Sequence, residues 1–145
     1  MGKYMTEKNK SKNYFKSFKK KSGTLIPFSL KNDIPFKVKR IFLIYGKKNF
    51  IRGNHAHKKC SQFILPIHGK IQIQYEGKNF KNIEKLDYKK KESCYLKPLT
   101  WCKIKFLTNN SVIMVFCNRE YEYKDYIENY KLFKKNIAKK KWKLS

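Results

Sequence analysis

The 145-residue sequence has no apolar run close to the roughly 20 residues that a membrane-spanning helix needs, which excludes an integral helical membrane protein. Its beginning has no apolar stretch followed by a small-residue cleavage site, so no secretory signal is expected. The four cysteines (Cys60, Cys94, Cys102 and Cys117) form no C-x-x-C pair and have no zinc-ligand spacing. We therefore expect buried, reduced thiols in a cytoplasmic protein.

Acidic residues and arginine are also scarce. Lys and Arg total 36 against 10 Asp and Glu, a net charge of +26, yet only Arg40, Arg52 and Arg119 are arginines. A strong positive charge is typical of nucleic-acid binders, but bidentate recognition of phosphate or guanine favours arginine over lysine. A dedicated nucleic-acid-binding module is therefore the less favoured interpretation. The lysine-rich surface should still attract anionic ligands, and less so at high salt.

What is present indicates one folded domain. Hydrophobic residues make up 41% of the chain and aromatic residues 16%, which excludes a wholly disordered protein. Residues 1–22 are rich in lysine and asparagine and are predicted to form a basic tail, or an arm lying on a neighbouring subunit. Residues 23–145 are predicted to form the domain itself.

Short apolar segments separated by turn signals fill most of that domain. The segment KIQIQY at 70–75 alternates apolar and polar residues, which is typical of a strand with one buried face. Many short strands at regular spacing predict an all-β sandwich or barrel rather than a parallel sheet. From about 122 to 140 the apolar residues recur at helical spacing instead, which predicts a C-terminal α-helix without a chemical role. The predicted strands lie at 23–30, 38–46, 62–69, 70–77, 93–98, 101–107 and 111–118.

The segment RGNHAHKKCSQFILPIHG, residues 52–69, is the most informative one. His55 and His57 are two residues apart, so on a strand both imidazoles point to the same face. Two imidazoles inside a barrel can bind a metal or move protons near neutral pH. An exposed histidine pair on a basic loop is the alternative, but Gly53, Gln62 and Gly69 give the segment a strand-turn rhythm that favours a site.

That rhythm resembles the first motif of the cupin superfamily, in which H-x-H is followed by a glutamate and a glycine turn. The resemblance implies a double-stranded β-helix, or jelly roll. Metal-binding cupins use these two histidines, the glutamate and a third histidine from a second motif near a proline. Here Gln62 occupies the glutamate position, and the KPLTWCK segment at 97–103 offers no histidine. A neutral amide cannot replace the carboxylate of such an iron site, so we expect no metal and no other cofactor.

The ordered strings RIFLIYG, RGNHAHKKCSQ, HGKIQI, LKPLTW, VFCNREY and DYIENYKLF are similar to the sugar 3,4-ketoisomerases that act on dTDP-4-keto-6-deoxyglucose. The similarity runs from about residue 23 to residue 137. It implies a cytoplasmic homodimer of jelly rolls that moves the ketone from C4 to C3, in a pathway to 3-amino sugars of bacterial lipopolysaccharide. It further implies His55 as the base at carbon and His57 as the proton shuttle between two sugar oxygens.

The remaining candidates follow from their places beside these motifs. Arg52 and Tyr45 are the candidates for stabilising the charge of an enediolate, with core packing the alternative for Tyr45. Gln62 is a candidate hydrogen-bond partner of the sugar, and Trp101 can border the sugar or the thymine. Family members often have histidine where this chain has Cys102, so which pocket group touches the sugar stays open. The candidates for holding the diphosphate are Lys58, Lys97 and Lys103.

Two classes of alternative function remain on the sequence alone. A dTDP-sugar epimerase or a metal-dependent cupin oxygenase would share the barrel. A non-enzymatic nucleic-acid-binding module would use the lysine surface. A galacto configuration of the product at C4 is favoured over gluco, without support from a particular residue.

Overall fold

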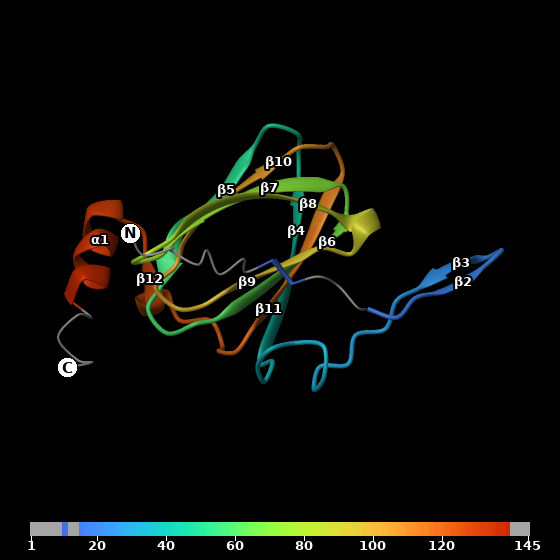
Figure 1. Cartoon of the computed structure of the whole chain (residues 1–145), viewed down its shortest axis with the longest axis horizontal. Helices are drawn as coiled ribbons and strands as arrows, with labels where there is room; N and C mark the ends of the chain where they lie inside the picture. Colours follow the sequence, from blue (N-terminus) through green and yellow to red (C-terminus); the bar gives the residue numbers. More distant parts are fainter. Residues whose placement is uncertain (1–9, 12–14, 140–145) are drawn as a thin grey trace, which may run out of the picture.

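The chain folds into two antiparallel five-stranded sheets that face each other, with one helix near the C-terminal end (Figure 1). The computed structural model describes residues 10–11 and 15–139. From β4 to β12 the chain passes repeatedly between the two sheets, apart from the β7–β8 hairpin, as a jelly roll requires. The first sheet has the order β1 (Lys10–Ser11), β9 (Ser93–Leu96), β6 (Gln62–His68), β11 (Ser111–Cys117) and β4 (Arg40–Gly46). The second has the order β12 (Tyr126–Ile127), β5 (Ile51–His57), β10 (Trp101–Phe106), β7 (Lys70–Glu76) and β8 (Lys81–Asp87). The all-β prediction with a C-terminal helix is therefore confirmed.

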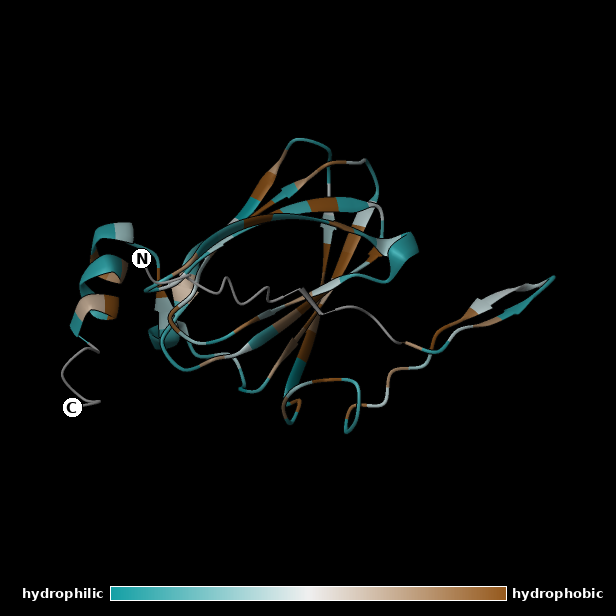
Figure 2. Cartoon of the chain, in the orientation of Figure 1, coloured by the Kyte–Doolittle hydropathy of each residue, from teal (hydrophilic) through white to brown (hydrophobic). Residues whose placement is uncertain are grey.

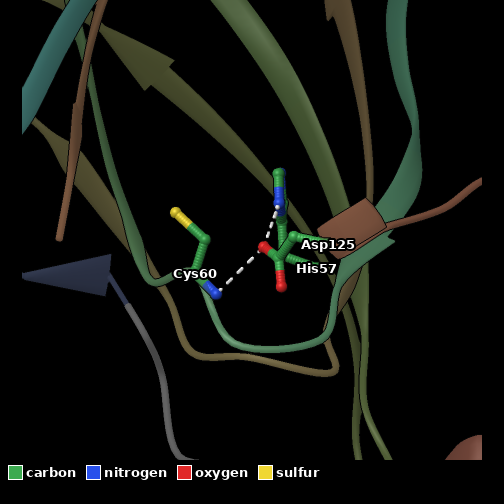
Figure 3. A group of neighbouring side chains, drawn as sticks. All are labelled: His57, Cys60 and Asp125. Atoms are coloured by element: carbon green, nitrogen blue, oxygen red, sulfur yellow. Dashed lines mark hydrogen bonds and ion pairs between the residues drawn. The ribbon is translucent and has the colours of Figure 1, made fainter. Parts of the chain in front are cut away.

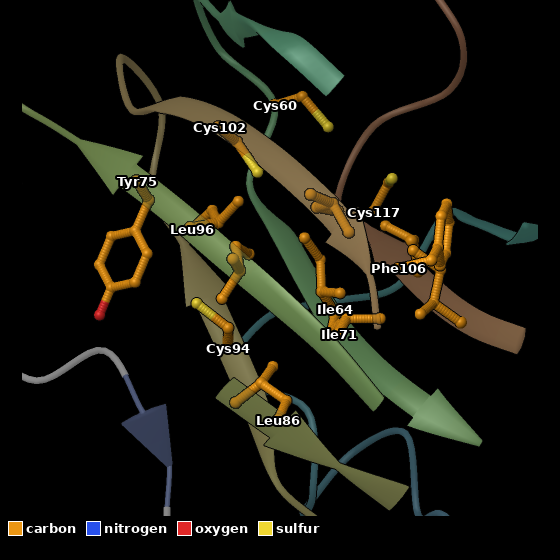
Figure 4. Packing of buried hydrophobic residues seen from close by; sticks show 14 residues of the cluster. Cys60, Ile64, Ile71, Tyr75, Leu86, Cys94, Leu96, Cys102, Phe106 and Cys117 are labelled. Atoms are coloured by element: carbon orange, nitrogen blue, oxygen red, sulfur yellow. The ribbon is translucent and has the colours of Figure 1, made fainter. Parts of the chain in front are cut away.

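The main hydrophobic core lies between the two sheets. Along β7 and β10, buried residues alternate with partly exposed ones, so every second side chain points inward. Figure 2 shows the same alternation of hydrophobic and hydrophilic residues along the strands. Figure 4 shows side chains from several strands meeting in this core, including Ile64, Ile71, Leu86 and Phe106. All four cysteines are buried, as expected, and none is in a disulfide.

The strand predictions hold best where turn residues flank an apolar run. Three turns lie where they were predicted. His68-Gly69 separates β6 from β7, Glu76-Gly77 follows β7, and Asn109-Asn110 separates β10 from β11. Gly69 has a φ of 79°, and a Cβ there would meet the Thr108 Oγ1 atom at 2.4 Å, so this turn requires glycine. The strand β8 (Lys81–Asp87) was not predicted, because its two apolar residues, Ile83 and Leu86, are three positions apart and do not alternate with polar ones.

Part of the predicted basic tail belongs to the folded structure. Phe15 is buried and its ring lies 4.7 Å from that of Phe28 in an edge-on contact. The strands β2 (Phe18–Lys20) and β3 (Gly23–Leu25) form a hairpin that extends away from the barrel (Figure 1). The predicted boundary between residues 22 and 23 thus falls in the turn of this hairpin. Residues 1–9, 12–14 and 140–145 lie outside the described part of the chain.

The C-terminal helix begins later than predicted. α1 spans Tyr130–Lys139, whereas the segment before it forms a 3-10 turn at Tyr123–Asp125 and the short strand β12. Tyr126 and Ile127 pair with His57 and Ala56 of β5. The helical spacing of apolar residues misled the prediction here, because a strand end beside β5 also buries Ile127. None of the described helices is long and apolar enough to cross a membrane.

Candidate active site

A cavity of about 430 Å³ lies between the two sheets. Phe42, Ile44 and Ile64 form part of its apolar wall. Four polar side chains enter it from three strands: Arg52 and His55 of β5, Gln62 of β6 and Tyr126 of β12. Three of the four, Arg52, His55 and Gln62, were predicted as site residues. A concave apolar cavity with a few converging polar groups is the usual form of a small-molecule site.

A bulge in β5 explains how Arg52 and His55, three residues apart, line the same cavity. In a regular strand, residues at odd spacing point to opposite faces. Cys102 pairs with His55 and Lys103 pairs with Gly53, which leaves Asn54 as an extra residue with a φ of 61°. Gly53 has a φ of 88°, and a Cβ there would lie 2.8 Å from the Cys102 carbonyl oxygen. The glycine next to the H-x-H motif is therefore required by the bulge that places Arg52 beside His55.

His57 lies deeper than His55 and is fixed by a carboxylate. The rings of the two histidines are 5.1 Å apart and nearly perpendicular. The Nδ1 atom of His57 lies 3.0 Å from Asp125 Oδ2, and both side chains are 6% exposed. Asp125 also accepts hydrogen bonds from the backbone amides of Lys59 (2.7 Å) and Cys60 (3.2 Å). The C-terminal segment, predicted to have no chemical role, thus supplies the carboxylate beside His57, because pairing of β12 with β5 brings Asp125 there.

These contacts fix the charge and the tautomer of the pair. Burial opposes ionisation of Asp125, but the Lys59 amide, His57 and the Cys60 amide together keep its pKa below the usual value. Burial lowers the pKa of His57 to about 4, and the hydrogen bond that His57 donates to Asp125 only partly compensates. A carboxylate can only accept, so a neutral His57 must carry its proton on Nδ1. Its Nε2 atom is then an acceptor, and this atom has no hydrogen-bond partner among residues 10–11 and 15–139.

His55 stands at the cavity wall and is also neutral near pH 7. Burial lowers its pKa, and a hydrogen bond to the backbone of Gly53 partly offsets that effect. Its ring lies 5.0 Å from the ring of Tyr126, and that of His57 lies 4.3 Å from it. Burial raises the pKa of Tyr126, so the phenol stays protonated and can donate a hydrogen bond. The sequence analysis missed Tyr126 and Asp125 because both were assigned to the predicted helix.

Four predicted site residues lie away from this cavity. Tyr45 is 76% exposed, because the alternation of β4 turns its side chain to the outer face of the sheet. Lys58 is on the surface, where its Nζ atom donates to the Lys124 carbonyl oxygen. Trp101 and Lys103 point to the outer side of β10, where they line a separate cavity of about 540 Å³. Trp101 packs on Phe133 of α1, with ring centroids 5.5 Å apart.

Cys102, which lies between Trp101 and Lys103 in β10, points inward instead. It borders the main cavity and also a small space of about 10 Å³ that it shares with His55, His57, Gln62 and Lys97. Lys97 is thus the predicted lysine that the structure brings close to the histidines. The strand period explains the outcome at this motif, because successive residues of β10 alternate between the inside and the outside.

The polar groups of the cavity do not fit the metal site of a cupin. His55, His57 and Gln62 provide two imidazoles and a neutral amide, with neither carboxylate nor third imidazole. Among the described residues, one group brings potential metal ligands within 4.8 Å of one another: His57, Cys60 and Asp125. Figure 3 shows the His57 ring and the Cys60 amide directed at the carboxylate, while the Cys60 sulfur points away from it. This group is organised as a hydrogen-bonded support for the imidazole.

The jelly-roll fold, with His55 at the wall of a cavity and His57 directly behind it, defines the class of cupin proteins. Comparison with known proteins narrows that class. Residues 8–138 match the family model described as "FdtA: WxcM-like, C-terminal". The TDP-4-oxo-6-deoxy-alpha-D-glucose-3,4-oxoisomerase of Aneurinibacillus thermoaerophilus is 32% identical over 126 residues, which cover 86% of this chain and 90% of the relative.

Solved structures agree with this family. The sugar 3,4-ketoisomerase QdtA of Thermoanaerobacterium thermosaccharolyticum, in complex with TDP, is 31% identical with a TM-score of 0.81, covering 91% of this chain and 96% of its own. WlaRA of Campylobacter jejuni, a TDP-fucose-3,4-ketoisomerase, is 26% identical with a TM-score of 0.80, covering 92% and 99%. WlaRB of the same organism, a TDP-quinovose 3,4-ketoisomerase, is 25% identical with a TM-score of 0.78, covering 89% and 99%. The chain belongs to the FdtA-like family of sugar 3,4-ketoisomerases and is an isomerase.

Proposed function

We propose that the protein converts dTDP-4-keto-6-deoxyglucose to a dTDP-3-keto-6-deoxyhexose through an enediolate, without a cofactor. The observation that carries the proposal is a pair of neutral imidazoles 5.1 Å apart, His55 at the cavity wall and His57 behind it, held by a buried carboxylate. The names of the relatives support the substrate, since the curated relative acts on the TDP-4-oxo-6-deoxyglucose that its name prints.

The first step is removal of a proton from carbon. The hydrogen at C3 is acidic because it is next to the C4 carbonyl, and its loss gives an enediolate with charge on the oxygen at C4. His55 is the proposed base, because its ring borders the main cavity and is neutral at pH 7. Return of the proton to C4 completes the shift of the carbon–hydrogen bond. A correctly placed acid or base of this kind typically contributes about 10²–10⁴ in rate.

The second requirement is a proton relay between the two oxygens. As the ketone moves to C3, the hydroxyl proton must leave the oxygen at C3 and reach the oxygen at C4. His57 suits this role, because its Nε2 accepts while its Nδ1 donates to Asp125. The ionised Asp125 then stabilises the imidazolium that forms transiently.

The enediolate charge needs a fixed donor or cation, because such stabilisation is often the largest contribution to catalysis. Arg52 keeps this proposed role, since its side chain borders the cavity with His55. Tyr126 replaces Tyr45 as the proposed phenol donor, because it contacts both histidine rings. Gln62 remains the proposed contact to the sugar, and Lys97 remains the proposed contact to the diphosphate.

The product defines the next reaction. A 3-keto sugar is the substrate type of a pyridoxal-phosphate aminotransferase, so we place this enzyme in the synthesis of a 3-amino-3,6-dideoxy sugar for a surface polysaccharide such as lipopolysaccharide. Its four reduced cysteines support a cytoplasmic location. We propose the galacto product, as for the TDP-fucose enzyme. The TDP-quinovose enzyme is almost equally similar to this chain, so the comparison does not discriminate, and measurement of the product decides.

Proton NMR of the purified protein with dTDP-4-keto-6-deoxyglucose tests the reaction directly. We expect the ketone to move to C3, with solvent deuterium entering the ring when the buffer is D₂O. In H₂O, a small coupling between H4 and H5 identifies the galacto product and a large one the gluco product. Ring exchange with the ketone still at C4 would instead show an epimerase.

The same assay after dialysis against EDTA tests the absence of a metal. Because Gln62 supplies no carboxylate, we expect turnover to remain within about twofold of the untreated protein, far less than the loss of a catalytic group causes. Loss of turnover that iron restores would show a metal-dependent cupin, and the proton-relay proposal would then be abandoned.

The exposed apolar face of β4 supports the proposed homodimer. Ile41, Leu43 and Tyr45 all project outward from this edge strand and are at least 43% exposed. Burying such a stripe against its own copy is the usual basis of a twofold dimer. We expect Leu43→Lys to convert the dimer to a monomer in light scattering. Ile83→Lys on β8, an edge strand of the other sheet, should leave the dimer intact. A wild-type mass equal to one chain would refute the dimer.

A further inference from the structure

Two of the four cysteines face each other behind the candidate active site. Cys60 is in the loop between β5 and β6, and Cys117 is the last residue of β11. The two strands hold them in register, since Cys117 pairs with Gln62 and the Asn118 side chain accepts from the Ser61 amide at 2.8 Å. The Cys60 thiol donates to the Ser61 carbonyl oxygen at 3.4 Å and lies close enough to Cys117 for each thiol to shift the pKa of the other. Figure 4 shows the Cys60 sulfur turned toward Cys117.

The sulfur of Cys117 is surrounded by hydrogen-bond donors. Arg40 Nη2 lies 3.5 Å from it and Gln62 Nε2 lies 3.8 Å from it. The neighbouring Cys60 thiol and the Arg40 guanidinium together lower the pKa of Cys117 to about 6 despite its burial. The neighbouring Cys117 and burial raise the pKa of Cys60. Cys117 is therefore the cysteine of the pair that loses its proton first.

The other two cysteines provide an internal comparison. Cys94 and Cys102 are equally buried in the same core, but neither has a guanidinium beside it. Burial raises the pKa of both, to about 12 for Cys102. Since the thiolate is the nucleophile, structural cysteines of this kind are inert, whereas a thiolate beside arginine reacts with electrophiles.

The pair lies directly behind the histidines. Cys60 borders the small space of about 10 Å³ that also touches His55, His57 and Gln62. Cys60 is 4% exposed and Cys117 is fully covered, so a reagent reaches Cys117 only when the structure opens locally around the pair. The backbone of Cys60 also holds Asp125, which couples the pair to the support of His57.

We propose that Cys60 and Cys117 form a reactive dithiol that a small peroxide converts to a disulfide. The Cys117 thiolate attacks one oxygen of hydrogen peroxide, the O–O bond breaks, and the products are a sulfenic acid and hydroxide. The Cys60 sulfur then attacks the sulfenic sulfur, the S–O bond breaks, and a second hydroxide leaves. Two thiols and one peroxide thus give one disulfide and two water molecules, after proton transfer to both hydroxides.

Mass spectrometry of the purified full-length protein tests this site independently of turnover. After a brief treatment with hydrogen peroxide at pH 7, we expect the intact protein to lose two hydrogens and to regain them with dithiothreitol. Peptide mapping should then join the peptides that carry Cys60 and Cys117, while Cys94 and Cys102 stay reduced. In Cys60→Ala the reaction should stop at a sulfenic acid on Cys117, which adds one oxygen to the intact mass and which dimedone traps once the oxidised protein is denatured.

Substitution of the arginine separates a reactive thiolate from mere proximity. We expect Arg40→Gln to slow disulfide formation by at least about fivefold, because less Cys117 is ionised at pH 7. Arg119→Gln is the matched control, since Arg119 is paired with Glu122 instead, and Arg40→Lys keeps the charge should the glutamine variant unfold. Equal oxidation of all four cysteines, an unchanged rate in Arg40→Gln, or peroxide-resistant Cys60 and Cys117 would each overturn the proposal.

Discussion

Replacing His55 with asparagine is expected to lower kcat by about 10²–10⁴-fold while dTDP still binds with nearly unchanged affinity. Asparagine is close to histidine in size and keeps a hydrogen-bonding side chain, but it cannot accept a proton near pH 7. His55 borders the cavity and makes no contact with Asp125, so its replacement removes the proposed base and leaves the support of His57 in place. Turnover by NMR and dTDP binding by calorimetry measure the two effects separately.

His68→Asn is the matched control for this substitution. His68 is exposed at the end of β6, where its Nδ1 atom lies 2.8 Å from the Asn110 carbonyl oxygen. We expect its variant to retain normal turnover, because His68 is at the opposite end of β6 from Gln62, the residue of that strand whose amide enters the cavity. A normal kcat in His55→Asn would remove this residue from the mechanism.

Asp125→Asn is expected to lower kcat by about 10²-fold or more with a much smaller change in KM. Asp125 acts through His57 and so is a positioning residue. An asparagine oxygen can still accept from Lys59, but its amide group then faces the His57 nitrogen and the Cys60 amide with a donor. His57 must rotate or place its proton on Nε2, and either change removes the acceptor that the relay requires.

The titration of His57 distinguishes this positioning role from a loss of stability. Burial already lowers the pKa of His57 to about 4, and the carboxylate is the group that opposes this shift. Without it, the midpoint of the His57 ring-proton titration should move to still lower pH. Asp87→Asn is the control. Asp87, the last residue of β8, also accepts a backbone hydrogen bond, from Lys89, but it is not near His55 or His57. A parallel fall of kcat in both variants, with the His57 titration unmoved, would assign Asp125 a merely structural role.

The strands and the histidine motif could be predicted because their signals are local. Period-2 alternation and turn residues depend on neighbouring positions, and they located β6, β7, β9, β10 and β11 within a few residues. Gly53 carries the same kind of information, since only glycine suits its positive φ beside the Cys102 carbonyl. The site residues near this motif, His55, Arg52 and Gln62, therefore reach the cavity as expected.

The errors arise where the local sequence pattern does not decide between helix and strand, or between the inner and the outer face of a strand. Tyr126 and Ile127 fit helical spacing as well as a strand, and only the free edge of β5 selects the strand. Trp101 and Lys103 are adjacent in sequence to a pocket residue, but the pleat sends them outward and Cys102 inward. Tyr45 ends a strong strand, yet its parity along β4 places it outside.

The sequence by itself determined the sheet class, the burial of the cysteines and the two imidazoles on one strand face, because each follows from composition or from residues a few positions apart. Only the tertiary structure decided which carboxylate holds His57, which phenol stands beside the histidines and which cysteines face each other. Asp125 lies 68 positions from His57 and Cys117 lies 57 from Cys60 along the chain. Such contacts depend on how the strands pair and on the parity of each residue within its strand, which local patterns do not record.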